Sequence, residues 1–104
     1  MNEAELQSAV IELAQLLGYR VAHFRPAMNA RGEWRTPVQA DGKGFVDLVL
    51  VKDRVLYREL KSARGTLSVE QQDWLHALKL AGADVDVWRP DDWTSGAIEA
   101  ELRR

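Results

Sequence analysis

The sequence contains no cysteine and only two histidines, and these scarcities narrow the kinds of metal site that it can hold. Without cysteine, neither disulfide bonds nor thiolate ligands are possible. His23 and His76 are too few for a structural zinc site, and we expect both to have structural roles. Any bound metal ion is therefore expected to be a hard cation held by oxygen atoms.

Long apolar runs are also absent. The longest extends from Val46 to Val51, is interrupted by Asp47, and is far too short to cross a bilayer, so no membrane partner is expected. The first residues lack the basic start and apolar centre of a secretory signal, which favours a cytoplasmic location. With 104 residues and no repeats or internal linkers, the chain is expected to form one domain over residues 1–104.

The net charge of −2 conceals an uneven distribution along the chain. Residues 1–19 carry a charge of −3 and residues 66–104 a charge of −4, whereas residues 20–65 carry +5. A basic band between two acidic flanks suits binding to a phosphate backbone, which attracts proteins mainly through lysine and arginine. A solvated basic surface without a ligand would show the same pattern.

Hydrophobic periodicity and breaker residues predict the secondary structure. Apolar residues at spacings of four and three, from Leu6 to Leu17, predict a helix over residues 3–17 that stops at Gly18. Ser68 with Gln71 three positions later matches a capping box, which predicts a second helix that stops at Gly82. Residues 25–43 show no periodicity and are expected to form a long loop. Strands are predicted at residues 19–24, 45–51, 55–60 and 84–88, and a short helix after Pro90.

The order of these elements predicts an α/β fold with a central mixed β-sheet of about four strands flanked by helices. The two middle strands, joined by a short turn at residues 52–54, form an antiparallel hairpin at the heart of the sheet. The last strand follows a helical crossover, so it can run parallel to a neighbour.

Three charged residues on the hairpin indicate a site of chemistry. Glu59 and Lys61 are two positions apart on one strand, so their side chains point to the same face, roughly 7 Å apart. A hairpin folded about residue 53 brings Asp47 opposite positions 59 to 60. Because Asp47 is the only charge within an apolar strand, it needs a cation or strong donors beside it.

This set of residue types fits the hydrolysis of phosphodiester bonds. Asp47 and Glu59 can hold Mg²⁺, with the backbone carbonyl of Leu60 and water molecules as further ligands. The metal ion lowers the pKa of a bound water and neutralises charge on the phosphate. Lys61 can orient the attacking water or stabilise negative charge. A structural ion pair on a half-exposed hairpin remains the alternative interpretation.

The ordered set of motifs resembles the VRR-NUC group of the PD-(D/E)XK nuclease superfamily. The resemblance spans Glu3 to about Trp93 and rests on Gly44-Phe45-Val46-Asp47, Glu59-Leu60-Lys61, Gly65-Thr66-Leu67-Ser68 with Gln71, and Trp88-Arg89-Pro90. It implies a restriction-endonuclease-like core, dependence on Mg²⁺ or Mn²⁺, and no organic cofactor. Stand-alone members, often from phages and bacteria, act as homodimers on branched DNA, including four-way (Holliday) junctions, which implies a bacterial or phage-infected host cell.

The resemblance also implies roles for single residues. Asp47 and Glu59 become metal ligands, Lys61 the catalytic lysine, and Gln71 an active-site residue, although Gln71 has an equally good role in the capping box. An acid of the first helix becomes a further metal-site residue. We choose Glu3, because it lies on the apolar stripe that faces the core; Gln7 is a weaker second candidate, and Glu5 is expected to face solvent. Glu3 could instead only complement the helix dipole.

Basic residues in the loops at the predicted active-site end of the sheet are candidates for contacts with the DNA backbone: Arg25, Arg31, Arg35, Lys43 and Arg64. Trp34 could stack on an unpaired base, although packing against its own loop is the better expectation. Trp74, Trp88 and Trp93 are expected in the core or in a dimer contact.

Three functions remain open at this point. The leading hypothesis is an endonuclease selective for branched DNA, and the second is a flap or general DNA nuclease. The third is a catalytically inactive DNA-binding or scaffold module. Only Val46, which stands where the family has proline, points towards the third; proline shapes the backbone but binds no metal, so we expect the site to survive.

Overall fold

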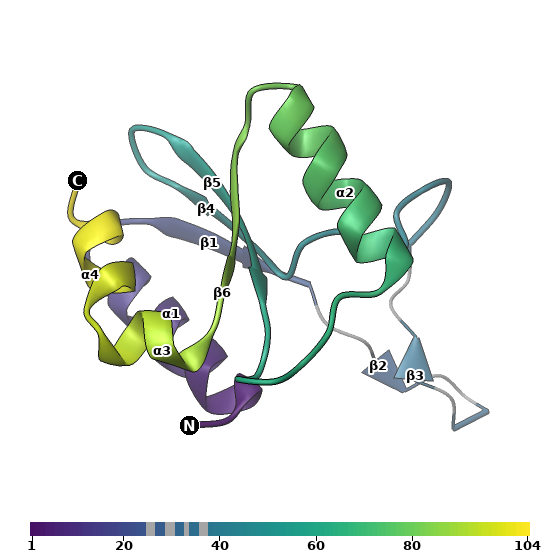
Figure 1. Cartoon of the computed structure of the whole chain (residues 1–104), viewed down its shortest axis with the longest axis horizontal. Helices are drawn as coiled ribbons and strands as arrows, with labels where there is room; N and C mark the ends of the chain where they lie inside the picture. The colour runs from purple at the N-terminus through teal and green to yellow at the C-terminus, as the bar shows by residue number, and fades with distance from the viewer. Residues whose placement is uncertain (25–26, 29–30, 33, 36–37) are drawn as a thin grey trace.

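The computed structural model describes residues 1–24, 27–28, 31–32, 34–35 and 38–104, with the backbone alone at residues 27, 28, 34 and 35. One helix precedes a run of five strands, and a second helix, a sixth strand and two short helices follow (Figure 1). Their order is α1 (Glu3–Leu16), β1 (Arg20–His23), β2 (Ala27–Met28), β3 (Trp34–Arg35), β4 (Leu48–Val51), β5 (Val55–Leu60), α2 (Val69–Leu80), β6 (Asp84–Trp88), α3 (Pro90–Thr94) and α4 (Ala97–Leu102). Within the described residues, no helix is long and apolar enough to span a membrane.

Four strands form one mixed sheet in the order β1-β4-β5-β6. β4 pairs antiparallel with both β1 and β5, whereas β6 runs parallel to β5 after the crossover through α2. The predicted α/β fold with a mixed sheet of four strands is therefore confirmed, including the hairpin at its centre.

The two faces of the sheet are packed differently. The core face carries the inward leucines of the hairpin, Leu48, Leu50, Leu56 and Leu60, which are buried against residues of α1 and α4 such as Leu6 and Ile98. α1 itself begins at a capping box between Asn2 and Glu5, and its stripe of Leu6, Val10 and Ala14 is fully buried. Burial of this continuous apolar layer is the main source of stability for the domain.

The opposite face, here called the α2 face, carries Val49, Tyr57 and Glu59. α2 lies on this side, away from α1, α3 and α4 (Figure 1). None of its residues is fully buried, and its contact with the sheet is mainly to β6. Aromatic contacts help to hold the helix against the sheet. The ring of Trp74 packs edge to face against that of Phe45, with centroids 5.0 Å apart.

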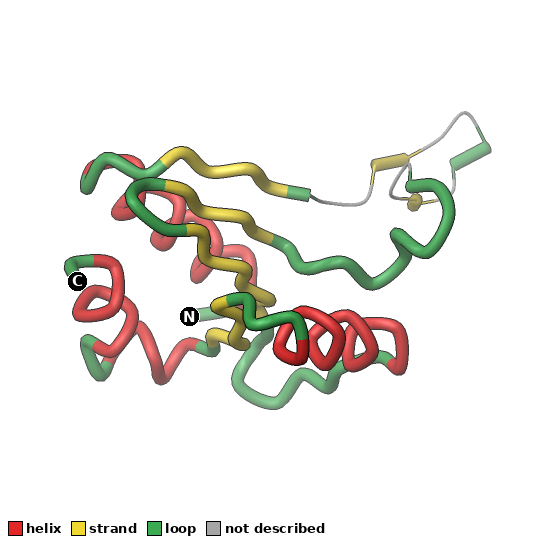
Figure 2. The backbone as a smooth tube through the Cα atoms, turned by 90° about the horizontal axis from the view of Figure 1, so that it is seen from above, coloured by secondary structure: helices red, strands yellow, loops and turns green. Residues whose placement is uncertain are grey.

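Three details differ from the predictions. The long loop contains a two-stranded antiparallel sheet, β2 with β3, which lies apart from the main sheet (Figures 1 and 2). β4 begins at Leu48, so Asp47 precedes the strand instead of lying within it. The single short helix after Pro90 is two helices, because Gly96 takes a left-handed conformation with φ of +83° and begins a new one.

Candidate functional site

The carboxylates of Asp47 and Glu59 meet on the α2 face of the hairpin. Leu48 is paired with Arg58, and extension of this register by one residue places Asp47 opposite Glu59. The backbone N–H of Asp47 donates to Oε1 of Glu59 at 3.2 Å, and the N–H of Leu60 donates to Oδ2 of Asp47 at 2.8 Å. Each carboxylate thus accepts a hydrogen bond from the strand of the other. The predicted meeting of the two acids is observed, whereas their role as metal ligands stays a prediction.

Glu59 is a buried and incompletely compensated carboxylate. Its side chain is 1% exposed, and among the described residues its Oε2 has no hydrogen-bond partner. Burial, and after it the nearby charge of Asp47, raise the pKa of Glu59 from the ordinary value of 4.5 to about 8. A buried acid in this state favours either a bound proton or a bound cation.

Lys61 places a positive charge beside this carboxylate. Its Nζ lies 3.9 Å from Oε2 of Glu59, and its side chain is only 15% exposed. The ammonium group lowers the pKa of Glu59, but burial and Asp47 outweigh it. The predicted grouping of two carboxylates with one ammonium is therefore observed, and the ammonium lies at the outer limit of an ion pair.

Gly44 allows the segment before Asp47 to pack directly onto the start of α2. A Cβ atom at this position would lie 2.6 Å from the backbone carbon of Glu70 and 2.8 Å from the nitrogen of Gln71. Gly44 also has φ of +84°, a conformation that other residues rarely adopt. The close approach therefore requires glycine at this position of the motif, and it packs the start of α2 against the segment that leads to Asp47.

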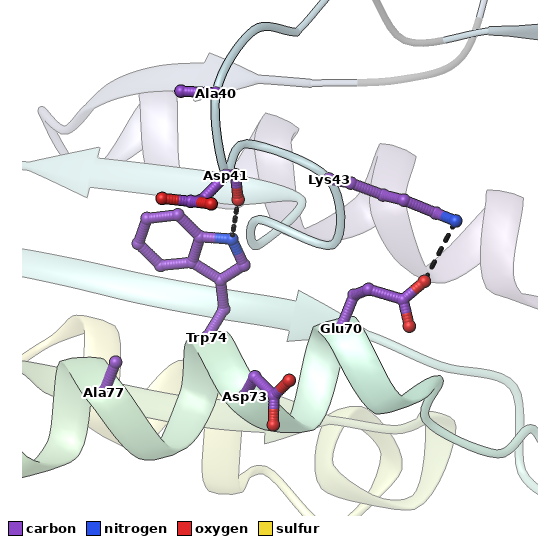
Figure 3. Close-up of a pocket in the computed structure, with 7 residues that line it drawn as sticks. All are labelled: Ala40, Asp41, Lys43, Glu70, Asp73, Trp74 and Ala77. Carbon is purple, nitrogen blue, oxygen red and sulfur yellow. Dashed lines mark hydrogen bonds and ion pairs between the residues drawn. The ribbon is translucent and has the colours of Figure 1, made fainter.

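Two polar contacts hold the same segment against α2 (Figure 3). Nζ of Lys43 lies 2.9 Å from Oε1 of Glu70, and this ammonium lowers the pKa of the Glu70 carboxyl. The indole N–H of Trp74 donates to the backbone carbonyl of Asp41 at 2.8 Å. The first half of α2 is thus connected to the chain on the N-terminal side of Asp47.

Gln71 takes the capping role that the sequence predicted. Its backbone N–H donates to Oγ of Ser68 at 3.1 Å, and its Oε1 accepts from the N–H of Ser68 at 2.9 Å. The capping box keeps one oxygen of Gln71 occupied and leaves its amide nitrogen as the group that can donate to a ligand. A role of Gln71 in catalysis stays a prediction.

Glu3 does not face the core, and that part of the prediction is wrong. The side chain is exposed in the first turn of α1, one turn before Leu6, the first buried residue of the helix. Glu5 is also exposed and is bound to the N–H of Asn2. Within the described residues, no group of three or more acidic or histidine side chains is close enough to hold a metal ion. A role of Glu3 at a metal site stays a prediction.

The predicted DNA-contact residues lie in different surroundings. Arg31 and Arg64 are exposed, and the side chain of Lys43 is 81% exposed despite its ion pair. Arg35 and Trp34 form strand β3, and the structure describes only the backbone of these two residues. Arg25 lies outside the described residues.

An open hollow of about 590 Å³ lies beside α2 (Figure 3), and its lining does not include Asp47 or Glu59. It is lined by Ala40, Asp41, Lys43, Glu70, Asp73, Trp74 and Ala77. Three of these side chains are acidic and one is basic, which suits a phosphate backbone poorly. The candidate site is therefore the surface of the sheet at Asp47 and Glu59, and not this hollow.

Sequence reasoning missed a residue that lies next to Asp47. The backbone N–H of Phe24 donates to the carbonyl of Asp47 at 2.9 Å, immediately after the last pair of the β1–β4 ladder. Phe24 is 44% exposed, and its ring meets that of Phe45 edge to face. Only the pairing of β1 with β4 brings Phe24 to the site, and no local signal in the sequence predicts that register.

Other tryptophans are placed largely as expected. Trp88 is buried in the core, and Trp93 is partly buried against it. His76, one of the two histidines, is exposed on the surface of α2.

No protein-family model, curated protein or solved structure matches this chain. The resemblance to the VRR-NUC group therefore rests on the motifs of the sequence and stays a prediction.

Proposed function

We propose that the protein is a Mg²⁺- or Mn²⁺-dependent endonuclease that hydrolyses phosphodiester bonds in DNA, on a restriction-endonuclease-like core. The observation that carries the proposal is the Glu59 carboxylate, which is buried, lies against Asp47 and has one oxygen without a hydrogen-bond partner in the described part of the chain. Strongly raised pKa values of this kind are concentrated at functional sites.

The donor set fits a hard divalent cation. Asp47 and Glu59 offer two carboxylates on adjacent strands, and Mg²⁺ in proteins commonly binds through one or two carboxylates while keeping several waters. The backbone carbonyl of Leu60 is a further candidate ligand. When bound, such an ion supplies a water of lowered pKa and neutralises charge on the phosphate.

The remaining roles belong to side chains that surround the pair. Lys61 stabilises the negative charge that develops on the phosphate, or orients the attacking water, from its place next to Glu59. The amide of Gln71 and the N-terminus of α2, which Gly44 brings close, favour a phosphate oxygen. Water adds to phosphorus, one P–O bond breaks, and the leaving oxygen takes a proton. No covalent intermediate is required.

The DNA is proposed to be branched, with a four-way junction as the leading substrate. Such a junction has approximate two-fold symmetry and needs two matched cuts, which a homodimer with two active sites supplies. Arg31, Arg64 and Lys43 are exposed and support contacts with the phosphate backbone. We place this activity in the cytoplasm of a bacterial or phage-infected cell.

Val46 is the sequence feature that points towards an inactive scaffold, and the buried carboxyl of Glu59 weighs against that function. Val46 stands where the family has proline, and in the fold it is 1% exposed. Neither proline nor valine offers a side-chain metal ligand, so the change removes no candidate ligand. A module that had lost its chemistry would have no reason to keep Glu59 buried without a full set of partners.

The test is cleavage of three labelled DNAs of matched sequence: a four-way junction, a 5′ flap and a plain duplex. Each is incubated with the pure protein in Mg²⁺, in Mn²⁺ and in EDTA. Asp47→Asn is the inactive comparison, and Asp53→Asn is its matched control, because Asp53 is an exposed acid in the turn of the same hairpin.

We expect metal-dependent cutting of the junction that Asp47→Asn abolishes and Asp53→Asn preserves. Equal cutting of all three DNAs would favour a general nuclease. Binding without cutting in either metal would favour the non-catalytic module, and an Asp47→Asn variant as active as the parent would overturn the assigned site.

A further inference from the structure

Phe24 begins a row of side chains that crosses the sheet at the candidate site. Its N–H is bound to the carbonyl of Asp47, Asp47 lies opposite Glu59, and Glu59 is paired with Val87 of β6. Directly opposed residues on neighbouring strands point to the same face, with Cβ atoms about 5 Å apart. The phenyl ring therefore stands on the α2 face, immediately beside the carboxylate pair.

The ring of Phe24 contacts a neighbouring ring and is partly exposed. Phe45 meets Phe24 at an interplanar angle of 78° with centroids 5.6 Å apart. Phe45 is in turn held by Tyr57 and Trp74, at 6.4 Å and 5.0 Å. Because the contact with Phe45 is edge to face, it fixes the orientation of the pair without stacking two faces together, and 44% of Phe24 stays exposed.

Phe24 does not belong to the apolar core. The apolar side chains of the core face are buried to within a few per cent, whereas Phe24 leaves nearly half of its area in water. A phenyl group cannot bind metal or phosphate, so its contribution beside two carboxylates must come from its apolar face. Among the parts of a DNA substrate, only a base offers a flat surface that matches this face.

A base can stack on a protein ring only when it has left its own neighbours. Bases inside a continuous duplex are covered above and below, whereas unpaired bases at branch points, bulges and ends can be splayed out onto aromatic side chains. An aromatic ring next to the site of hydrolysis thus selects DNA in which the nucleotide adjoining the cut is unpaired.

We propose that Phe24 forms a stacking subsite for the unpaired nucleobase adjacent to the phosphate that is cut at Asp47 and Glu59. The inference rests on the proposed nuclease function and extends it. It names the chemical feature of the substrate that the site selects, an unpaired base, and the residue that selects it.

The test compares two fluorescein-labelled probes by fluorescence anisotropy in EDTA, so that no cutting takes place. Both are duplexes interrupted by three unpaired nucleotides, which are adenines in the first probe and abasic residues in the second. The variants are Phe24→Ala, Phe24→Leu and Phe24→Trp. Val55→Ala is the matched control, because Val55 lies on the α2 face, is 41% exposed and stands at the far end of β5 from Glu59.

We expect Phe24→Ala to weaken binding of the adenine probe by about five- to a hundredfold, since stacking on one aromatic residue contributes that much. Binding of the abasic probe should change by less than about twofold, because there is no base to lose. Phe24→Leu, which keeps an apolar side chain without a flat ring, should behave like Phe24→Ala. Phe24→Trp should retain the preference for adenine, and Val55→Ala should resemble the parent.

Equal losses on both probes, or no loss on either, would overturn the inference while leaving the nuclease function intact, provided that the parent still cuts in Mg²⁺. A parent that neither binds nor cuts DNA would overturn both.

Discussion

Arg58 and Glu59 are neighbours in the chain, and both are almost fully buried, yet the two faces of the sheet treat them differently. On the core face, the terminal nitrogens of Arg58 bind Asp84 at 2.8 Å, the carboxylate of Glu101, and the backbone carbonyls of Tyr57 and Asp84. The guanidinium also lies 4.9 Å from the ring centre of Trp88.

On the α2 face, Glu59 has one backbone N–H and a lysine at 3.9 Å. A buried charge with partners at this distance is poorly compensated, whereas one with several direct hydrogen bonds is well compensated. The comparison supports a structural role for Arg58 and the proposed role of Glu59 as a ligand-binding residue.

The largest expected effect comes from removal of the Glu59 charge. Glu59→Gln keeps the shape of the side chain but weakens metal binding, and we expect cleavage to fall by about a thousandfold, since a catalytic metal supplies several kcal/mol. The metal-free protein should be no less stable, because the substitution removes a buried carboxyl that must either take up a proton or carry a poorly compensated charge. Cleavage of a labelled junction and urea unfolding measure the two outcomes. A variant that keeps its activity would show that Glu59 is structural.

The reverse experiment removes the charge on the core face. Arg58→Met removes the ion pair of Glu101 with Arg58 and leaves Asp84 with the longer ion pair to Arg54, at 3.5 Å. We expect the free energy of unfolding to drop by about 3 kcal/mol. Arg103→Met is the control, because Arg103 makes an exposed ion pair with Glu99 at 2.9 Å, and its loss should change stability by about 0.5 kcal/mol or less. Urea unfolding measures the free energy of unfolding of both variants. Equal losses for Arg58→Met and Arg103→Met would contradict the structural role of Arg58.

The pH dependence of stability sharpens the comparison further. The pKa of Glu59 is raised in the folded state to about 8, so between about pH 5 and pH 8 the folded protein binds one more proton than the unfolded chain. This contribution to stability is fully present at low pH and is lost as pH rises to about 8, by at most about 1.4 kcal/mol per pH unit.

Urea unfolding of metal-free protein at several pH values should therefore show a decline for the parent that Glu59→Gln lacks. Saturating Mg²⁺ should reduce the decline, because the ion replaces the proton. Identical pH profiles for the parent and Glu59→Gln would contradict the raised pKa.

The smallest expected effect belongs to Lys61. Its ammonium lowers the pKa of Glu59, so Lys61→Met should shift the titration of Glu59 upward by less than about one pH unit, the range expected for a weak ion pair. NMR titration of the carboxyl carbon measures this shift. A downward shift would show that Lys61 does not act on Glu59 electrostatically.

Local signals in the sequence predicted much of the fold. Ser68 and Gln71 form the capping box that starts α2, and Gly82 follows its end, because caps depend only on residues within one turn. The meeting of Asp47 with Glu59 was also predictable, because a short turn around residue 53 determines which residues of a hairpin face each other.

Features that depend on distant partners were not predictable. On the core face of β5, Arg58 lies between Leu56 and Leu60. Its partners Asp84 and Glu101 are 26 and 43 positions away in the chain. The exposure of Glu3 depends on where the core ends beneath α1, which the helical periodicity of α1 does not reveal. The same applies to Phe24, whose place beside Asp47 follows from the pairing of β1 with β4.

The ion-pair network of Arg58 has a consequence for the opposite side of β5. If this strand slipped by one residue against its neighbours, every side chain would change face, and Glu59 would lie among leucines while Arg58 approached Asp47. Such a misaligned strand would lose the contacts of Arg58 with Asp84 and Glu101 together. The contacts of the Arg58 guanidinium on the core face therefore stabilise the register of β5 that places the Glu59 carboxylate opposite Asp47 on the α2 face.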